Sequence, residues 1–185
     1  VPQDIRERKG AFFTPRIWVE LSPTYLTDYL GENWPDDSYI WDCAAGTGNL
    51  LAGLTNKYNI YASTLDQADV NVMHERIDHG ANLLKNNVFQ FDFLNDDFSK
   101  LPQSLKDIIN DEEKRKKLVV YINPPYAESG DSKQRMGTGK NKANVASETM
   151  IYKIHSDNYG TATRELFTQF LIRINSEITN SIVAH

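Results

Sequence analysis

The sequence predicts an α/β fold in which a mostly parallel sheet carries helices on both faces. Apolar segments of strand length alternate along the chain with longer segments of helical periodicity, which is the order found in parallel sheets. One of these segments, 118-LVVYIN-123, is apolar nearly throughout, as expected of a strand covered on both faces, and 38-SYIWDC-43 reads as a short buried strand. The predicted class is therefore a Rossmann-like sheet, whose ligands bind at the carboxyl ends of the strands.

The elements can be placed in chain order. Residues 16–30 read as a helix in which Ser22-Pro23 is expected to start a new turn, as N-cap and first residue. After the first strand, Gly46-Thr47-Gly48 is expected to lead into a helix through Asn49 to Lys57. A polar segment of 127 to about 160 is interpreted as a loop. Strands are expected at 38–43, 59–65, 88–93, 118–123 and from about 181. The remaining helices are expected at 68–82, 103–117 and 162–178.

Length and composition indicate one domain with a substantial core. The chain has 185 residues, and we expect 1–185 to form a single catalytic domain. Its single cysteine, Cys43, excludes an internal disulfide and is typical of a cytoplasmic protein. Apolar runs stay shorter than the roughly 20 residues that span a bilayer, so no membrane contact is expected. Because the chain begins without methionine and ends inside an expected strand, we expect a piece of a longer protein, truncated at its C-terminal strands.

Charge argues against a surface that binds nucleic acid over its whole area. The net charge is −5, from 20 Lys and Arg against 25 Asp and Glu. A local basic segment remains, in surroundings rich in Gly, Ser and Asn; it contains Lys133, Arg135, Lys140 and Lys142. It reads either as a solvated polar loop or as a loop that orders over DNA phosphates.

The exit of the first strand, 42-DCAAGTGNLL-51, is a candidate small-molecule cradle. Gly46 and Gly48 allow a tight turn and a close approach of the backbone to a ligand. The third glycine of the dinucleotide fingerprint is missing, since Leu51 occupies its place. A nucleoside without phosphates is therefore favoured over a dinucleotide, and a hydride-transferring enzyme is disfavoured.

Two further strand exits carry groups that a nucleoside needs. Asp66 can accept hydrogen bonds from ribose hydroxyls, and Asp92 can accept one from an adenine amino group. The ring of Phe93 can pack on the base. The structural alternatives are a helix cap for Asp92 and a core position for Phe93.

The fourth strand ends in Asn123-Pro124-Pro125-Tyr126. A residue before proline is restricted to extended geometry, and proline has a fixed φ and no N–H. The motif is therefore a rigid rim that carries an amide oxygen, a carbonyl and an aromatic ring. Such a rim suits a planar group with an NH₂, whose two hydrogens meet two acceptors while Tyr126 stacks on its face.

This motif, downstream of Asp42-x-x-x-Gly46-x-Gly48 and of 9-KGAFFTP-15, resembles the DNA adenine-N6 methyltransferases of bacterial restriction–modification systems. The resemblance implies S-adenosylmethionine as cofactor and double-stranded DNA with a flipped adenine as substrate. It implies that the cofactor contacts Phe13, Thr14, Pro15, Asp42, Ala44, Gly46 and Gly48, with Asp92 and Phe93 on its adenine. The catalytic residues would be Asn123, Pro124, Pro125 and Tyr126, with Asn123 and Pro124 on the target amine and Tyr126 on the base.

The chain departs from that family pattern in the position of the ribose-binding acid and in lacking further strands and a DNA-reading domain. Many relatives carry the ribose-binding acid two residues earlier than Asp66, where this chain has Thr64. The family also has further strands after the one beginning near Ser181 and a separate DNA-reading domain. A specificity or nuclease domain or subunit is therefore an expected partner.

Other enzyme classes share parts of this set of motifs. Protein glutamine-N5 methyltransferases also use Asn-Pro-Pro-Tyr, because a carboxamide presents a planar NH₂ too, but they generally lack a segment like 9-KGAFFTP-15. Cytosine-N4 enzymes usually carry Ser in place of Asn123. An inactive cofactor-binding fragment is the alternative from a different class. A metal site is not expected, since His74 and His79 are five residues apart and off the spacing of one helical face.

Overall fold

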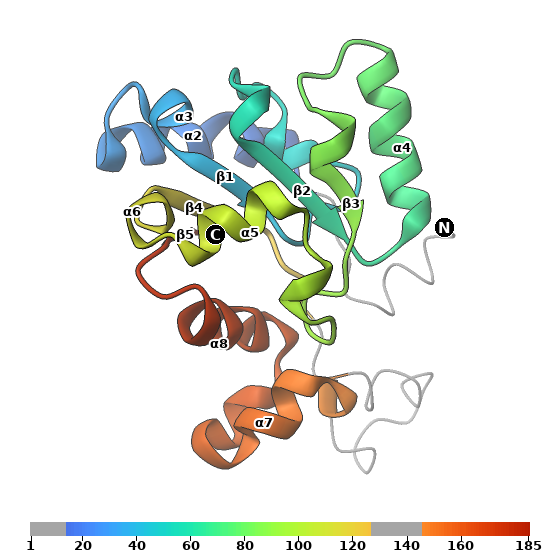
Figure 1. Ribbon diagram of the computed structural model, residues 1–185, viewed down its shortest axis with the longest axis vertical. Coiled ribbons are helices and arrows are strands. Elements are labelled where there is room, and N and C mark those ends of the chain that lie inside the picture. The colour runs from blue at the N-terminus through green and yellow to red at the C-terminus, as the bar shows by residue number, and fades with distance from the viewer. Residues whose placement is uncertain (1–13, 127–145) are drawn as a thin grey trace. The chain divides into compact units, whose positions relative to one another are not determined.

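The computed structural model describes residues 14–126 and 146–185 of the chain (Figure 1). These residues form two compact units. The sheet unit contains the described residues up to Asn123 together with Ile178–His185, and the helical unit contains those between Pro124 and Glu177. That 1–185 act as one catalytic domain stays a prediction.

The sheet unit is built on five parallel strands in the order β3-β2-β1-β4-β5. The fold class predicted from the sequence is confirmed. From β1 the chain winds outward through β2 and β3, and it then crosses to β4 on the other side of β1. The switch point of the sheet therefore lies between β1 and β4. The strands are β1 (Tyr39–Asp42), β2 (Ile60–Thr64), β3 (Val88–Gln90), β4 (Leu118–Tyr121) and β5 (Ile182–Ala184).

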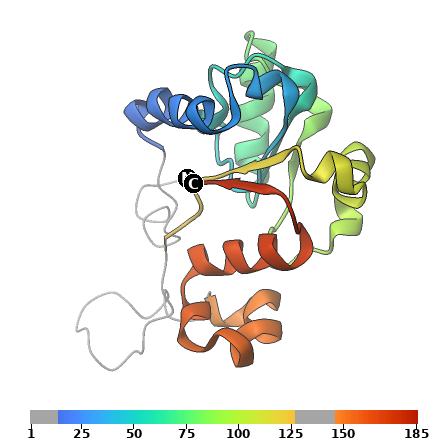
Figure 2. The same cartoon turned by 90° about the vertical axis from the view of Figure 1, so that its left-hand side faces the viewer.

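Helices cover both faces of this sheet (Figures 1 and 2). On one face, a core cluster joins side chains of β1, β2 and β4 to Leu26, Trp34 and Met73. These three come from α2 (Arg16–Leu30), α3 (Trp34–Asp37) and α4 (Gln67–Asp78) respectively. The other face carries α5 (Gln103–Asn110) and α6 (Glu112–Arg115). Burial on both sides explains why the central strands are apolar over most of their length.

The helical unit contains α7 (Met150–Tyr159) and α8 (Leu166–Glu177), connected by a 3₁₀ segment η6 (Gly160–Arg164). Gln169, which is fully buried, holds its parts together. Its Nε2 donates to the carbonyls of Ala146 (2.7 Å) and Thr163 (2.6 Å), and its Oε1 accepts from the hydroxyl of Thr149 (2.6 Å). A buried amide with its hydrogens and its oxygen bonded in this way fixes one arrangement of the unit.

The structure differs from the predicted elements at three places in the sheet unit. A single 3₁₀ turn, η1 (Asn49–Leu51), replaces the helix expected from 49 to 57, because Gly53 has φ +92° and breaks the helical path. Helix α2 continues through Pro23, since the Ser22 hydroxyl donates to the carbonyl of Trp18 (2.6 Å) instead of capping a new helix. The helix expected at 103–117 divides at Asp111, whose carboxylate accepts from the N–H groups of Glu113 and Lys114 in α6.

The interpretation of 127–160 as a loop is wrong for its last part. Helix α7 begins after Thr149, whose hydroxyl accepts from the N–H of Tyr152 (3.0 Å) as an N-cap. Ile151 is its buried anchor. Among the described helices, none is both long and apolar enough to cross a membrane.

Candidate active site

The carboxyl ends of the strands bring several predicted site residues to one edge of the sheet. β1 ends at Asp42, β2 at Thr64 and β4 at Tyr121, and all pairs of neighbouring strands are parallel. Asn123 follows β4 and is the last residue of the sheet unit before the chain enters the helical unit. Asp42 and Asn123 therefore flank the switch point, where open α/β sheets bind their ligands.

Asp42 is a buried acid, with 1% of its surface exposed. Burial raises its pKa to about 7, and a hydrogen bond from the N–H of Ala44 to Oδ1 (3.0 Å) opposes this shift only in part. A carboxylate held in this way is stabilised by a nearby positive charge.

Tyr121 lies beside Asp42, because the parallel register pairs Trp41 of β1 with Val120 of β4. Its hydroxyl forms a hydrogen bond with the hydroxyl of Ser22 on α2. Burial raises the pKa of Tyr121, the charge of Asp42 adds to the shift, and the bond to Ser22 opposes it. Helix α2 is thereby tied to the last residue of β4.

The two glycines after β1 have different surroundings. Both have positive φ, +52° at Gly46 and +80° at Gly48. A Cβ added at Gly46 would meet none of the described residues within 4 Å, whereas one added at Gly48 would lie 3.1 Å from Sδ of Met73. The described residues therefore leave space beside Gly46 that a ligand can occupy, and Gly48 allows close packing against α4.

Arg76 is a residue that the sequence analysis missed. Its Nη1 donates to the carbonyl of Thr47 (2.7 Å) and to Oδ1 of Asn49 (2.9 Å), so α4 holds the glycine loop from the side. Nothing in the local pattern around Arg76 marks it, since a basic residue in the last turn of a helix is common.

The exit of β2 presents both candidates for the ribose. Thr64 is the last residue of β2 and is buried, with 6% of its surface exposed. Asp66 is only partly buried and is the N-cap residue of α4. The acid is thus the more accessible of the two, and its contact with a ribose stays a prediction.

At the exit of β3, Phe93 takes the core position given as its structural alternative, whereas Asp92 lies in a turn and does not cap a helix. Asp92 closes a local turn, with Oδ1 accepting from the N–H of Leu94 (3.0 Å) and Oδ2 from Nδ2 of Asn95 (2.8 Å). Phe93 is buried and packs edge-on against Trp41, with ring centroids 5.5 Å apart. A carboxylate can accept about four hydrogen bonds, so the turn leaves capacity for a ligand. The predicted contacts with an adenine remain predictions.

Asn123 is half-buried, and its Nδ2 donates to Oγ1 of Thr14 (3.0 Å). The next residue after Thr14, Pro15, is the N-cap residue of α2. Both Thr14 and Pro15 were predicted to contact the cofactor, and the structure places Thr14 against the predicted catalytic amide.

The rest of the Asn-Pro-Pro-Tyr motif belongs to the helical unit. Pro124 is buried, Pro125 is half-buried and Tyr126 is exposed. The ring of Tyr126 stacks on Phe167 of α8, with centroids 5.7 Å apart and 18° between the ring planes. Phe13 and the four basic residues predicted to approach DNA, Lys133, Arg135, Lys140 and Lys142, lie outside the described residues.

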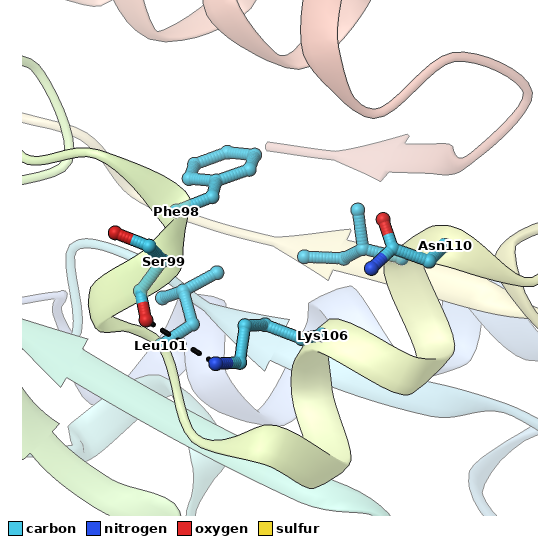
Figure 3. Close-up of a pocket in the computed structure, with 6 residues that line it drawn as sticks. Phe98, Ser99, Leu101, Lys106 and Asn110 are labelled. Carbon is cyan, nitrogen blue, oxygen red and sulfur yellow. Dashed lines mark hydrogen bonds between the residues drawn. The ribbon is translucent and has the colours of Figure 1, made fainter.

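A separate hollow of about 250 Å³ opens between the segment after β3 and helix α5 (Figure 3). Its described lining does not include any of the predicted site residues, and Nζ of Lys106 there donates to the carbonyl of Ser99 (3.2 Å). We therefore place the candidate site at the strand exits and not in this hollow. The lining residues are Phe98, Ser99, Leu101, Lys106, Ile109 and Asn110.

The comparison with protein families decides the assignment. The model of the N-6 DNA methylase family matches residues 3–174. The chain belongs to this family. The resemblance to DNA adenine-N6 methyltransferases that the sequence motifs indicated is confirmed.

A solved structure supports the fold of this family member. A protein in a cryo-EM structure of a DrdV–DNA complex matches it with a TM-score of 0.60 and 18% identity, over 94% of this chain and 20% of that chain. At this identity the likeness shows the fold alone. The chain spans about a fifth of the length of the protein it matches. No curated protein matches the chain.

Proposed function

We propose that the chain is the catalytic part of a methyltransferase that transfers a methyl group from S-adenosylmethionine to N6 of adenine in double-stranded DNA. The observation that carries the proposal is the position of Asn123 just after β4 at the switch point, whose other side is formed by β1 with the buried acid Asp42. Membership of the N-6 DNA methylase family supports it. We further propose a role in a cytoplasmic restriction–modification system, with a DNA-specificity or nuclease domain or subunit as partner.

The described residues fit the proposed cofactor. Gly46 borders open space that a Cβ would enter, which suits a ligand held against the backbone. The pKa of Asp42, raised to about 7 by burial, indicates a carboxylate that a positive charge would stabilise. S-Adenosylmethionine carries such a charge on its sulfonium and on its ammonium group. The residues proposed to hold it are Phe13, Thr14, Pro15, Asp42, Ala44, Gly46, Gly48, Asp66, Asp92 and Phe93.

When bound, the cofactor supplies an electrophilic methyl group on positively charged sulfur. The protein's part is to make the adenine amine a better nucleophile, because its lone pair is delocalised into the ring. Oδ1 of Asn123 and the carbonyl of Pro124 accept the two N–H hydrogens and stabilise the positive charge that develops on the nitrogen. Placed dipoles of this kind contribute about 3 kcal/mol each to a transition state. Pro125 stiffens the rim, since its φ is fixed.

Tyr126 stacks on the adenine base that carries the target amine. An adenine inside a duplex cannot reach the cofactor, so the base leaves the stack, and an aromatic side chain offsets part of the unstacking. Base–aromatic stacking is worth about 1–3 kcal/mol. More than half of the Tyr126 surface is exposed (54%), as a stacking role requires.

Protein glutamine-N5 methylation is the second candidate, because a carboxamide would bind the same pair of acceptors. The family match favours DNA, and so does 9-KGAFFTP-15, which glutamine methyltransferases generally lack. A chain that binds the cofactor without catalysis is the third candidate. Calorimetric titration with S-adenosylmethionine, run beside a methyl-transfer assay, separates binding from catalysis.

The decisive experiment identifies the product. The 185-residue chain and its parent protein are incubated with methyl-labelled S-adenosylmethionine and with DNA or protein. Mass spectrometry of the digested products then distinguishes N6-methyladenine, N4-methylcytosine and methylglutamine. We expect N6-methyladenine from the parent protein. Methylglutamine or N4-methylcytosine as the labelled product would overturn the proposal.

A further inference from the structure

We propose that Thr14 is a positioning residue that holds the side-chain amide of Asn123 with its oxygen toward the target amine. This inference rests on the proposed function. It assigns to Thr14 a task different from the cofactor contact that the family resemblance implies. The observation behind it is the hydrogen bond from Nδ2 of Asn123 to Oγ1 of Thr14, at 3.0 Å.

The orientation of the side-chain amide decides whether Asn123 can accept a hydrogen bond from the target amine. A primary amide has nearly the same shape after a 180° turn, but the turn exchanges an acceptor for two donors. With the nitrogen toward the substrate, the N–H groups of Asn123 would oppose the N–H groups of adenine. With the nitrogen on Thr14, as observed, Oδ1 is turned to the other side and can accept. The observed bond, in which the Thr14 hydroxyl accepts from Nδ2, therefore holds the amide in the productive orientation.

The backbone around Thr14 is restricted, so that its hydroxyl can hold the side-chain amide of Asn123 in one place. It precedes Pro15, and the residue before a proline is restricted to extended geometry. The carbonyl of Pro15 accepts from the N–H groups of Trp18 (3.0 Å) and Val19 (3.3 Å), so Thr14 is fixed to the start of α2.

Helix α2 is in turn bonded to the strand that carries Asn123. The hydroxyl of Ser22 on α2 pairs with that of Tyr121, the last residue of β4 and two residues before Asn123. The Thr14–Asn123 bond joins residues 109 positions apart in the sequence, and it closes a ring that runs through α2 and the end of β4. Supporting contacts of this kind keep a reacting side chain within its productive geometry.

The test compares three variants of the parent protein, with DNA as substrate. Thr14→Val removes the hydroxyl at nearly constant volume, Thr14→Ser retains it, and Thr24→Val makes the same change at an exposed position of α2. We expect Thr14→Val to lower kcat at saturating cofactor by roughly 10- to 100-fold, as loss of a supporting partner does. Thr14→Ser should restore most of kcat, and Thr24→Val should match the wild type.

The dissociation constant of the cofactor, measured by calorimetry, separates the two tasks of Thr14. A positioning role predicts a loss in kcat that far exceeds the loss in cofactor affinity. Wild-type kcat in Thr14→Val would overturn the inference. A loss confined to cofactor affinity would also overturn it, and so would a Thr14→Ser variant as impaired as Thr14→Val.

A second readout does not depend on activity. In the wild type and Thr14→Ser, NMR should show slow hydrogen exchange for the Nδ2 hydrogen of Asn123, and Thr14→Val should exchange faster. Equal rates in all three proteins would overturn the inference, even if the wild type makes N6-methyladenine. If the wild type methylates no adenine, the proposed function fails, while the exchange rates still report whether Thr14 holds the amide.

Discussion

The ring of Tyr126 lies nearly parallel to that of Phe167, with centroids 5.7 Å apart and 18° between the ring planes. Tyr126 ends the Asn-Pro-Pro-Tyr motif, and Phe167 lies in the first turn of α8. One face of the proposed base-stacking ring is therefore supported within the helical unit, while 54% of the Tyr126 surface stays exposed. The support restricts the ring before any base arrives.

Phe167→Ala should weaken stacking of the target base without touching the proposed acceptors of its amine. Stacked aromatic pairs contribute about 0.5–1.5 kcal/mol beyond their buried area. We therefore expect DNA affinity of the parent protein to fall by about 2- to 10-fold, with unchanged affinity for the cofactor. Fluorescence of 2-aminopurine at the target position measures the stacking directly.

Two further variants serve as controls for this prediction. Tyr126→Ala removes the stacking ring and should cost more affinity than Phe167→Ala, whereas Phe167→Tyr keeps an aromatic support and should be close to the wild type. If Phe167→Ala left 2-aminopurine fluorescence and DNA affinity unchanged while Tyr126→Ala reduced both, the supporting role of Phe167 would be refuted.

Asp42→Asn should make the free protein more stable than the wild type at pH 8. Burial raises the pKa of Asp42 from 3.8 to about 7. Between these pH values the folded state keeps a proton that the unfolded state has released. The contribution of Asp42 to stability is therefore complete below about pH 3.8 and falls as pH rises to about 7, by up to about 1.4 kcal/mol per pH unit. An asparagine stays neutral, and its Oδ1 can still accept from Ala44.

Urea unfolding from pH 4 to pH 8 measures this effect as the difference in unfolding free energy between variant and wild type. The difference should grow with pH in favour of Asp42→Asn. Asp36→Asn makes the same substitution at an exposed position of α3 and serves as the matched control. A difference for Asp42→Asn that does not change with pH would contradict the raised pKa. Calorimetry should also show weaker binding of S-adenosylmethionine, since the proposed partner of its positive charge is gone.

The strands and their exits could be predicted from the sequence because their signals are local. β1, β2 and β4 are mostly apolar and buried, and each was located to within about two residues. Once the alternation predicted a parallel sheet, Asp42 and Asn123 had to reach the same edge. Helix α7 was missed because its polar residues hide a short apolar pattern around Ile151, and the helix expected after Asn49 failed because Gly53 stops it.

The contacts that complete the candidate site could not be predicted in the same way. The bond between Thr14 and Asn123 spans 109 residues, and its existence depends on where α2 lies beside β4. The stack of Tyr126 on Phe167 likewise depends on the packing of the helical unit. No periodicity or spacing encodes such pairs, because they are set by tertiary packing.

Gly46→Ala should mainly lower cofactor affinity, whereas Gly48→Ala should mainly lower stability. Both positions have positive φ, so alanine strains the backbone at either one by roughly 1–2 kcal/mol. At Gly46 the new Cβ enters open space at the strand exit, and we expect cofactor affinity to fall by about 10-fold or more, the equivalent of one lost contact. At Gly48 it would lie 3.1 Å from Sδ of Met73, and we expect the larger loss of stability.

Urea unfolding and calorimetry on the same samples separate the two effects. Gly80→Ala is the control for backbone strain alone, since φ is +100° and an added Cβ would meet none of the described residues within 4 Å. It lies beyond the end of α4, away from Asp66 at the start of that helix. Gly80→Ala should lower stability and leave cofactor affinity unchanged. Wild-type cofactor affinity in Gly46→Ala would refute the placement of the ligand against this glycine.

Asn123→Ala should strongly reduce the rate of methyl transfer and leave cofactor affinity nearly intact. The variant removes an acceptor that acts on the amine as its positive charge develops, and loss of one such group lowers kcat by roughly 10²- to 10³-fold. The contacts proposed for the cofactor lie mainly at the exits of β1, β2 and β3, which the substitution does not touch. Single-turnover methyl transfer by the parent protein and calorimetry with S-adenosylmethionine measure the two quantities. A parallel loss of both would mean that Asn123 supports the fold of the cofactor site instead of acting on the amine.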